Sequence, residues 1–376
     1  MNPQDTRIAF YCSSLSWGGL EMNVVRYASW MKERGWKVFV FGVNGSRIQE
    51  EAIANSLEFI PVRRNGKHFD LVNAYRVSKL LKRHSIKLVW YRDNRDLSML
   101  AWTKWIPGTS FKLLYQQAMQ FGVSKKDIVH TIRFRHVNAW VSTLMFLANQ
   151  VKKMTNYPHK RISVIPLGSE LKTDSSISKT EAREFYHLPH DAFVFGILGR
   201  IDPLKGQDLL IRALAETDKM GKNVHVLIVG ESTLHEGNEY EDLLRKLVVK
   251  YGLSDRVHFY GYTKETQRFY SAIDVFVMAS KGETFGMVTI EAMSQGKPVI
   301  GSNSSGTPEL LQNEQAGWLF EPENYLDLRE RMIQVCQSPD EVETKGINAQ
   351  KVYRYFYSKE ASLHGFDLLL TSLGKS

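Results

Sequence analysis

The sequence predicts an α/β protein in which two doubly wound domains face each other across a cleft. Two features of the chain carry this prediction. Short apolar runs alternate with helical patterns along nearly all of the 376 residues, and a polar, Ser/Thr-rich segment at 171–180 interrupts the alternation once. Alternating strands and helices favour parallel sheets with helices on both faces, and a chain of this length suits two domains at roughly 100–200 residues each.

The apolar runs define the expected strands, and the polar segment divides them between the domains. The first group has strands expected at 8–12, 37–43, 57–62, 86–91, 111–115, 139–141 and 162–165, with a first helix at 20–34. The second group has strands expected at 193–198, 224–229, 257–260, 275–278 and 298–300. The domains are therefore placed at 1–172 and 173–355. Ligands of such sheets bind beyond the carboxyl ends of the strands, so loops that follow strands are the candidate sites.

The cysteines and the apolar stretches of the sequence indicate the cellular compartment of the protein. The two cysteines, Cys12 and Cys336, lie far apart without the spacing of metal ligands, which fits a reducing environment. Residues 1–7 are polar and give no secretory signal. The longest apolar stretch, 139–148, is about half of the roughly 20 residues that a membrane-spanning helix needs. These features predict a cytoplasmic protein without a membrane span.

Charge is distributed unevenly along the chain. Residues 1–172 hold 27 Lys and Arg against 11 Asp and Glu, whereas the remaining residues hold 22 against 29. A strongly basic half indicates a polyanionic partner for that half. Nucleic acid, anionic lipid and an acidic acceptor molecule all satisfy this criterion.

The strongest motif is KGETFGMVTIEAMSQGKPVI, at 281–300. Glu283 lies in a loop after an expected strand, 285–287 open a helix, and Glu291 follows eight residues after Glu283, about 12 Å along a helix axis at 1.5 Å per residue. The first N–H groups of a helix and its dipole suit a phosphate or a hydroxyl, and Gly286 lets a ligand approach the backbone. A solvated helix with a glutamate near its first turn explains the same pattern.

A second motif, GRIDPLKG at 199–206, lies between an expected strand and a helix. Arg200 and Lys205 can address one anion from the two ends of this loop. A diphosphate leaving group needs such charge as its bond breaks. The motif lacks the GxxxxGK[ST] pattern of a Walker loop, and a basic surface turn is the alternative.

A third motif, the glycine pair Gly18-Gly19, follows the first expected strand. Its backbone N–H groups could contact a phosphate. A tight turn is the alternative interpretation.

Together these segments resemble the retaining glycosyltransferases of the GT-B fold in glycosyltransferase family 4, the glycosyl transferases group 1. The resemblance covers nearly the whole chain and includes the glycine pair, GRIDPLKG, IVGE at 228–231, RVHFYGY at 256–262, the 281–300 motif and AGWLF at 316–320. The two glutamates that enclose seven residues, with Phe-Gly between them, are its most specific part. The resemblance implies two Rossmann-like domains and a final helix, 356–376, that packs back on the first domain.

The resemblance also implies the site. Glu283, Arg200 and Lys205 would be the catalytic residues, with Glu283 on the donor sugar hydroxyls and the two cations on the diphosphate. The donor-binding residues would be Gly18, Gly19, Asn23, Gly261, Tyr262, Phe285, Gly286, Met287 and Glu291. Glu291 would hold the ribose, and Tyr262 would lie near the base. The family needs no metal and no cofactor beyond the nucleotide-sugar, and no DxD-like motif is evident in this sequence.

One feature departs from the family pattern. Many members carry a histidine in the loop after the fourth or fifth strand of the first domain, whereas here the strand at 111–115 leads into Gln116 and Gln117. A catalytic histidine therefore cannot be assigned. His130 and His136 fall on an expected helix, where surface or core roles are the simpler interpretation.

The basic domain would hold the acceptor. Residues 63–87 carry eight Lys and Arg, and residues 102–135 mix tryptophan and phenylalanine with further basic residues. Basic residues and aromatic residues together suit the interface of an anionic bilayer, and a merely solvated basic face is the alternative interpretation. The sequence therefore predicts an enzyme on the inner face of the cell membrane that moves a hexose from a UDP-sugar, or secondly a GDP-sugar, to a lipopolysaccharide, glycolipid or other envelope glycan.

Three other functions stay open at this stage. A nucleotide-sugar epimerase of the same fold would release an epimer without an acceptor. A phosphorylase would need a pyridoxal-phosphate lysine, and nothing in the sequence points to one. A non-catalytic basic protein that binds membrane or nucleic acid would not need Glu283, Arg200 and Lys205 together.

Overall fold

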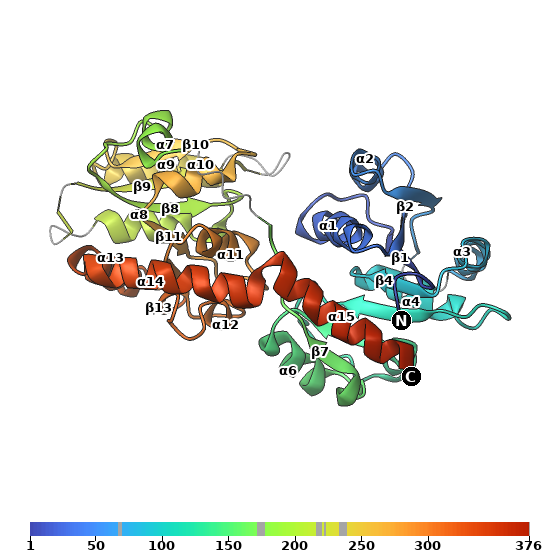
Figure 1. The fold of residues 1–376 in the computed structure, drawn as a ribbon. Helices are drawn as coiled ribbons and strands as arrows, with labels where there is room; N and C mark the ends of the chain where they lie inside the picture. Colours follow the sequence, from blue (N-terminus) through green and yellow to red (C-terminus); the bar gives the residue numbers. More distant parts are fainter. Residues whose placement is uncertain (67–69, 171–176, 216–219, 222, 233–238, 376) are drawn as a thin grey trace. The chain divides into compact units, whose positions relative to one another are not determined.

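The computed structural model describes residues 1–66, 70–170, 177–215, 220–221, 223–232 and 239–375. The chain divides into two compact units (Figure 1). Unit 1 comprises Met1–Pro166 with Leu363–Ser376, and unit 2 comprises Leu167–Ser362. Part of the expected linker, 171–176, and Lys67 of the basic stretch lie outside the described residues. The linker was expected to end at residue 180. It ends at Ser178, because helix α7, Lys179–Phe185, begins there with a capping box between Ser178 and Glu181.

Unit 1 contains, within its described part, a seven-stranded sheet whose pairings are parallel. Its order is β3-β2-β1-β4-β5-β6-β7. The strands are β1 Arg7–Cys12, β2 Lys37–Val43, β3 Glu58–Val62, β4 Leu88–Tyr91, β5 Lys112–Gln116, β6 Ala139–Ser142 and β7 Ile162–Val164. The strand order reverses between β1 and β4, which makes the carboxyl ends of these two strands the expected ligand edge.

Helices separate the strands of unit 1. They are α1 Gly19–Glu33, α2 Arg47–Ala54, α3 Leu71–Arg83, α4 Asn94–Thr103, α5 Ile128–Arg135 and α6 Met145–Met154, followed by the 3₁₀ turn η1 His159–Arg161. Aromatic side chains dominate the core: on one face of the sheet Trp140 contacts the rings of Tyr115 and Tyr157. On the other face Phe366, from the C-terminal segment, packs 4.2 Å from the ring of Trp90.

Unit 2 repeats this topology. Across its described residues the sheet has six parallel strands in the order β10-β9-β8-β11-β12-β13. They are β8 Phe193–Leu198, β9 Val224–Val229, β10 Val257–Tyr260, β11 Val275–Met278, β12 Val299–Ser302 and β13 Gly317–Phe320. The order reverses between β8 and β11, so the loops after these two strands meet at the switch point of the sheet.

The remaining helices of unit 2 lie between these strands or after them. They are η2 Pro203–Lys205, α8 Gln207–Ala215, α9 Glu239–Lys250, α10 Thr266–Ala272, α11 Met287–Ser294, α12 Thr307–Leu310, α13 Tyr325–Gln337 and α14 Pro339–Val352. The buried side chains of β8, β9 and β11 form one apolar core with α8, α9 and α13.

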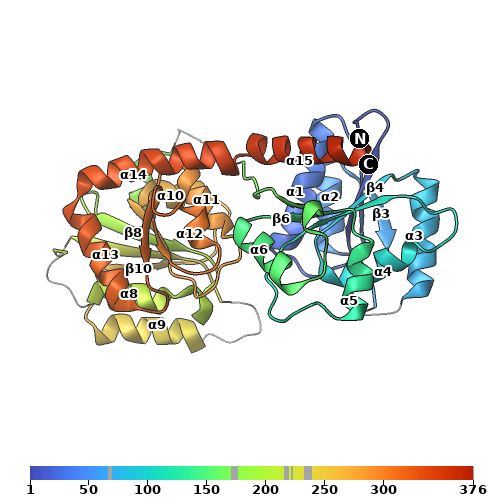
Figure 2. The same cartoon turned by 90° about the horizontal axis from the view of Figure 1, so that it is seen from below.

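The C-terminal segment is not one continuous helix. A π-helical turn, η3 Tyr353–Tyr357, precedes α15 Lys359–Lys375, and Ser358 between them has extended backbone with ψ 159°. Figure 2 labels the helices on either side of this turn, α14 and α15. A helix that begins at residue 356, as the apolar spacing suggests, is therefore wrong by three residues. Residues 363–376 belong to unit 1, where the amino group of Met1 donates a hydrogen bond to the carbonyl of Leu370 at 2.9 Å.

Candidate functional site

The loops after β8 and β11 meet at the switch point of unit 2. The backbone N–H of Lys281 donates to the carbonyl of Leu204 at 3.0 Å, which ties the two loops together. The Lys205 ammonium donates to Glu283 Oε2 at 2.6 Å, and both side chains keep partial exposure, 32% and 22%. The structure thus brings together two of the three expected catalytic side chains, where a ligand of this sheet would bind.

Lys205 owes its position to the turn that carries it. Asp202 accepts a hydrogen bond from the N–H of Leu204 at 2.8 Å and starts the 3₁₀ turn η2. Gly206 ends the turn with φ +72°, and a Cβ there would lie 2.5 Å from the carbonyl oxygen of Ala279. Only glycine combines this backbone conformation with so close an approach. The pattern Asp-Pro-Leu-Lys-Gly therefore fixes where the ammonium points.

Arg200, the third expected catalytic residue, is engaged within the same loop. Its guanidinium lies 2.9 Å from Asp202 Oδ2, and its side chain is 49% exposed. The carbonyl of Arg200 accepts from the amide of Gln207 at 2.9 Å, which holds the loop against α8. An anion that binds between Arg200 and Lys205 would have to share these cations with Asp202 and Glu283.

Helix α11 begins beside Glu283. Gly286 is its N-cap residue with φ +76°, and no described side chain caps the helix. Its first N–H groups therefore lack a side-chain acceptor, which suits an oxygen-rich ligand. The hydroxyl of Thr289 in the first turn is buried without a hydrogen-bond partner among the described residues. Phe285 is buried and packs against the ring of Tyr357, while Met287 is the first residue of the helix.

Glu291 lies further along α11 and contacts a tyrosine that sequence reasoning missed. The Tyr270 hydroxyl lies 3.3 Å from Glu291 Oε2 and donates to the carbonyl of Val288 at 3.0 Å. Burial, and then the charge of Glu291, raise the pKa of Tyr270 well above its ordinary value. Tyr270 therefore stays protonated, and its one hydroxyl hydrogen is shared between the carbonyl of Val288 and Glu291 Oε2. No motif marks it, because it lies on α10 and reads as a core aromatic residue.

Gly261 and Tyr262 follow β10 at the outer side of the same sheet edge. Both are exposed, Tyr262 at 64%. Two strands, β9 and β8, separate them from the switch point in the order of the sheet at the described positions. Their expected position near the base stays a prediction.

Three expected donor-binding residues belong to unit 1. Gly18 is the N-cap of α1 and Gly19 is its first residue. Asn23 is buried, donates to the carbonyl of Gly19 at 2.6 Å and accepts from Arg26 at 3.2 Å. The side chain of Asn23 thus serves the helix itself, and a role toward phosphate for it stays a prediction.

A buried acid, Asp96, lies at the switch point of unit 1 and was not predicted from the sequence. Asp96 on α4 accepts hydrogen bonds from the hydroxyl of Ser13 at 2.5 Å, the N–H of Ser13 at 3.2 Å and the amide of Asn65 at 2.7 Å. Burial raises the pKa of Asp96 to about 7, although these hydrogen bonds oppose the shift. Ser13 follows β1 and Asp96 follows β4, so position after a strand was the signal available.

Gln116, the first of the two glutamines after the strand expected at 111–115, is buried at the end of β5. Its side-chain oxygen accepts from the indole of Trp90 at 3.1 Å and from Arg92 Nη1 at 2.9 Å. Its amide nitrogen and Arg92 Nε have no hydrogen-bond partner among the described residues. Gln117 instead bonds to Trp140, Ser142 and the carbonyl of Met119, as a structural residue does. His130 lies on α5 as expected, whereas His136 is the residue that follows the end of the helix.

Comparison with known proteins finds a family model that matches part of unit 2. Residues 178–352 match the family model "Glycosyl transferases group 1". The chain is 32% identical over 190 residues to the D-inositol 3-phosphate glycosyltransferase of Mycolicibacterium smegmatis, covering 50% of this chain and 43% of that protein. It is 28% identical over 257 residues to the GDP-mannose-dependent alpha-(1-6)-phosphatidylinositol monomannoside mannosyltransferase of Mycobacterium tuberculosis, covering 64% of each. The chain thus matches less than two thirds of either relative.

Solved structures extend the similarity to the whole fold. The structure of Anabaena Alr3699/HepE in complex with UDP has a TM-score of 0.83 at 19% identity, over 99% of this chain and all of that one. The apo lipopolysaccharide outer core galactosyltransferase WaaB has a TM-score of 0.75 at 18% identity, over 98% and 99%. In the part of the chain that the structure describes, no helix is both long and apolar enough to cross a bilayer. Residues 178–352 therefore form a glycosyl transferases group 1 domain within a two-domain α/β chain that has the GT-B fold.

Proposed function

We propose that this protein is a retaining, metal-independent glycosyltransferase of family 4 that transfers a hexose from a nucleotide-sugar to a lipid-linked or cell-envelope glycan. The observation that carries the proposal is the Lys205–Glu283 pair, 2.6 Å apart at the switch point of the glycosyl transferases group 1 domain. A UDP-sugar is the first choice of donor and a GDP-sugar the second.

The chemistry assigns each group a task. The bond from the anomeric carbon to the diphosphate breaks, and its electron pair leaves on a phosphate oxygen. Lys205 and Arg200 neutralise that developing charge, and the first N–H groups of α11 add fixed dipoles. The acceptor hydroxyl attacks the face from which the diphosphate departs and passes its proton to a phosphate oxygen. Glu283 holds sugar hydroxyls, and Glu291, steadied by Tyr270, holds the ribose.

Names of similar proteins are consistent with this donor and acceptor chemistry. The mannosyltransferase of Mycobacterium tuberculosis is named for GDP-mannose and a phosphatidylinositol glycolipid. The Anabaena structure contains UDP, and WaaB is named for the lipopolysaccharide outer core. Both donor bases and both acceptor classes of the proposal are thus represented among similar proteins.

We further propose that the enzyme works at an anionic membrane surface through α5 and the residues before it. Within 119–135 five apolar side chains are exposed by 36% to 74%: Met119, Val123, Ile128, Val129 and Ile132. Lys126 and Arg135 in the same segment are also exposed. Each basic residue near an anionic bilayer contributes about 1 kcal/mol, and exposed apolar side chains add hydrophobic insertion. We call residues 119–135 the α5 surface.

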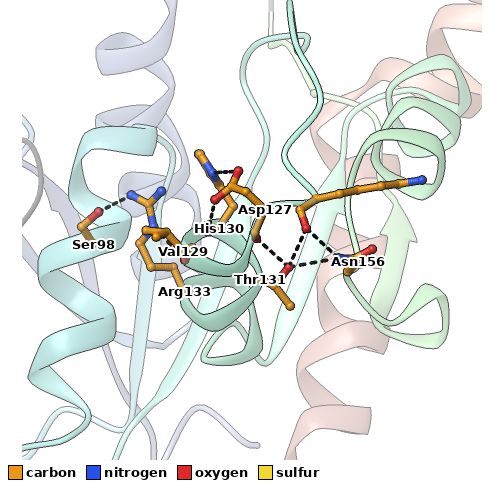
Figure 3. A network of polar contacts seen from close by, with 8 residues as sticks. Ser98, Asp127, Val129, His130, Thr131, Arg133 and Asn156 are labelled. Atoms are coloured by element: carbon orange, nitrogen blue, oxygen red, sulfur yellow. Dashed lines mark hydrogen bonds and ion pairs between the residues drawn. The ribbon is translucent and has the colours of Figure 1, made fainter.

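Polar contacts hold this surface in place (Figure 3). Arg133 of α5 donates to the hydroxyl of Ser98 on α4 at 2.7 Å. The amide of Asn156 donates to the carbonyl of Lys126 at 2.9 Å and to the hydroxyl of Thr131 at 3.1 Å. These bonds use the polar groups of the segment within unit 1, so that Ile128 and its apolar neighbours stay turned to solvent.

Thermal unfolding with UDP, GDP, ADP and their sugar conjugates tests the donor assignment. A ligand that binds only the folded state raises its stability by RT ln(1 + [L]/Kd), so a saturating donor gives a clear shift. We expect a shift with one nucleotide family, equal with and without magnesium and lost in Glu291→Ala. No shift with any nucleotide would refute the proposed donor site. The anomeric configuration of the product, read by NMR, tests retention.

A further inference from the structure

Unit 1 contains a cavity at the edge of its sheet opposite the switch point. The cavity has a volume of about 440 Å³ and is lined by residues at the start of β5, β6 and β7 together with α15. Because the strands pair in parallel, their amino ends share one edge and their carboxyl ends share the other. Ser13, Asp96 and Gln116 mark the carboxyl edge, so this cavity is separate from the candidate active site.

Cations dominate the lining of this cavity, which we call the basic pocket. Lys112 at the start of β5, Lys160 and Arg161 of η1 all line it, and none of the described lining residues is Asp or Glu. Lys160 and Arg161 are exposed, so solvent screens their mutual repulsion. An anionic ligand in the pocket would meet these three cations together.

A fourth cation, Lys104, contacts the lining residue Asn138 without being part of the lining itself. The Lys104 ammonium donates to the carbonyl of His136 at 2.9 Å and to Asn138 Oδ1 at 2.6 Å. Burial, then the charges of Arg161 and Lys112, lower the pKa of Lys104 to about 8. After burial, the positive charges of Arg161 and Lys112 thus also disfavour the charged form of Lys104.

Neutral donors complete the lining. The side-chain oxygen of Asn138 already accepts from Lys104 and, at 2.9 Å, from the N–H of Leu113, which leaves its amide N–H groups for another acceptor. Asn138 lines the pocket together with Ser163. Ser372 lines it too, but its hydroxyl already donates to the carbonyl of Leu369 at 2.8 Å. Lysine, arginine, amide and hydroxyl donors around one cavity suit an oxyanion with several acceptor oxygens.

We infer that the basic pocket binds a phosphate group, either of a free phosphorylated compound or of a lipid headgroup. Lys160, Arg161 and Lys112 supply the charge, and Asn138 supplies a neutral donor. Lys112 also donates to the carbonyl of Leu373 on α15. A phosphate here therefore stabilises the packing of residues 363–375 on unit 1. This inference is independent of the proposed transferase activity.

Two double variants of equal charge change test the inference. Lys160→Ala/Arg161→Ala removes two cations of the basic pocket, and Lys152→Ala/Lys153→Ala removes two exposed lysines of α6 outside it. Thermal unfolding is followed with inorganic phosphate against chloride at equal ionic strength, because phosphate also stabilises proteins nonspecifically. Both double variants are made in a protein that already carries Lys205→Ala, and this single variant is the reference. Phosphate bound through Lys205 at the candidate donor site then does not contribute. Pelleting with phosphatidylglycerol vesicles forms a second arm.

The two arms separate the sources of the phosphate group. A saturable phosphate shift that persists in the Lys152/Lys153 variant, and needs at least tenfold more phosphate in the Lys160/Arg161 variant, supports a free phosphorylated ligand. Vesicle binding that the Lys160/Arg161 variant alone loses, with no response to free phosphate, supports a lipid headgroup. Equal behaviour of the two variants in both arms overturns the inference.

Discussion

Lys205 and Glu283 lie 78 residues apart in the chain, yet their charged atoms meet at 2.6 Å. The contact follows from topology: β8 and β11 are neighbours where the strand order reverses, so the loops after them converge. Both side chains are partly exposed, so the pair itself contributes little to stability. Its value lies in holding a cation and a carboxylate ready for a charged, hydroxyl-rich ligand.

We expect Lys205→Ala to lower kcat by about 100-fold or more, the scale found when one donor to a developing charge is removed. Folding should be nearly unaffected, since the ion pair is partly exposed. Steady-state kinetics with the nucleotide-sugar that gives the thermal shift measures this effect.

Lys281→Ala is the matched control, because Lys281 forms a Lys–Glu pair with Glu323 at 2.7 Å with both side chains 57% exposed. Its kcat should stay within about threefold of wild type, since it removes no donor to the developing charge. Equal losses of kcat in the two variants would show that Lys205 has no special role in transfer.

Gly206→Ala should destabilise the protein and abolish nucleotide binding. Gly252 has a similar φ, +64°, but its added Cβ meets nothing within 4 Å, whereas the Cβ at Gly206 would lie 2.5 Å from the Ala279 carbonyl. Gly252→Ala therefore isolates the backbone cost of about 1–2 kcal/mol. Gly206→Ala should cost clearly more, and denaturant unfolding compares the two. Equal costs would mean that the Lys205 turn tolerates a side chain.

Much of the fold could be predicted from the sequence because buried parallel strands read as apolar runs. Each of the twelve expected strands is present, with bounds within two residues, among the described residues. The sequence motif AGWLF did not identify β13 as a strand, because Gly317–Phe320 has no long apolar run. The C-terminal helix was misplaced because apolar spacing continues through Tyr353–Tyr357, where the helix widens to a π turn before Ser358.

The site could be predicted where a motif lies within one loop, and not where it depends on contacts across the fold. Arg200, Lys205 and Glu283 could be chosen as candidates because their loops carry recognisable patterns. Tyr270 and Asp96 were missed because only the folded chain brings them to Glu291 and Ser13. The pairing of Arg200 with Asp202 was also not predicted, although the two residues stand two apart in one motif, because the motif was interpreted as a site for a diphosphate or a basic surface turn.

Asp96 should make stability depend on pH. Its pKa is raised from 3.8 to about 7 in the folded state, so the folded protein binds the proton more tightly than the unfolded chain. Its contribution is fully present below about pH 4 and is lost as pH rises through 7. Denaturant unfolding between pH 4 and pH 8 should show a decline that Asp96→Asn reduces by up to about 4 kcal/mol, at about 1.4 per pKa unit. A pH profile unchanged in Asp96→Asn would contradict this.

Ile128→Ser should weaken binding to anionic vesicles at low salt, since Ile128 is 74% exposed on the α5 surface and its burial in the interface is worth about 1.5–3 kcal/mol. The control is Val249→Ser, 72% exposed on α9 of unit 2, where the proposal places no membrane contact. A loss of about tenfold in vesicle affinity for Ile128→Ser alone is expected. Because basic residues act beside the apolar ones, added salt should weaken binding of both wild type and variant. Unchanged vesicle binding by Ile128→Ser would contradict a membrane contact through Ile128. Vesicle binding that does not change with salt would contradict a contribution from the basic residues.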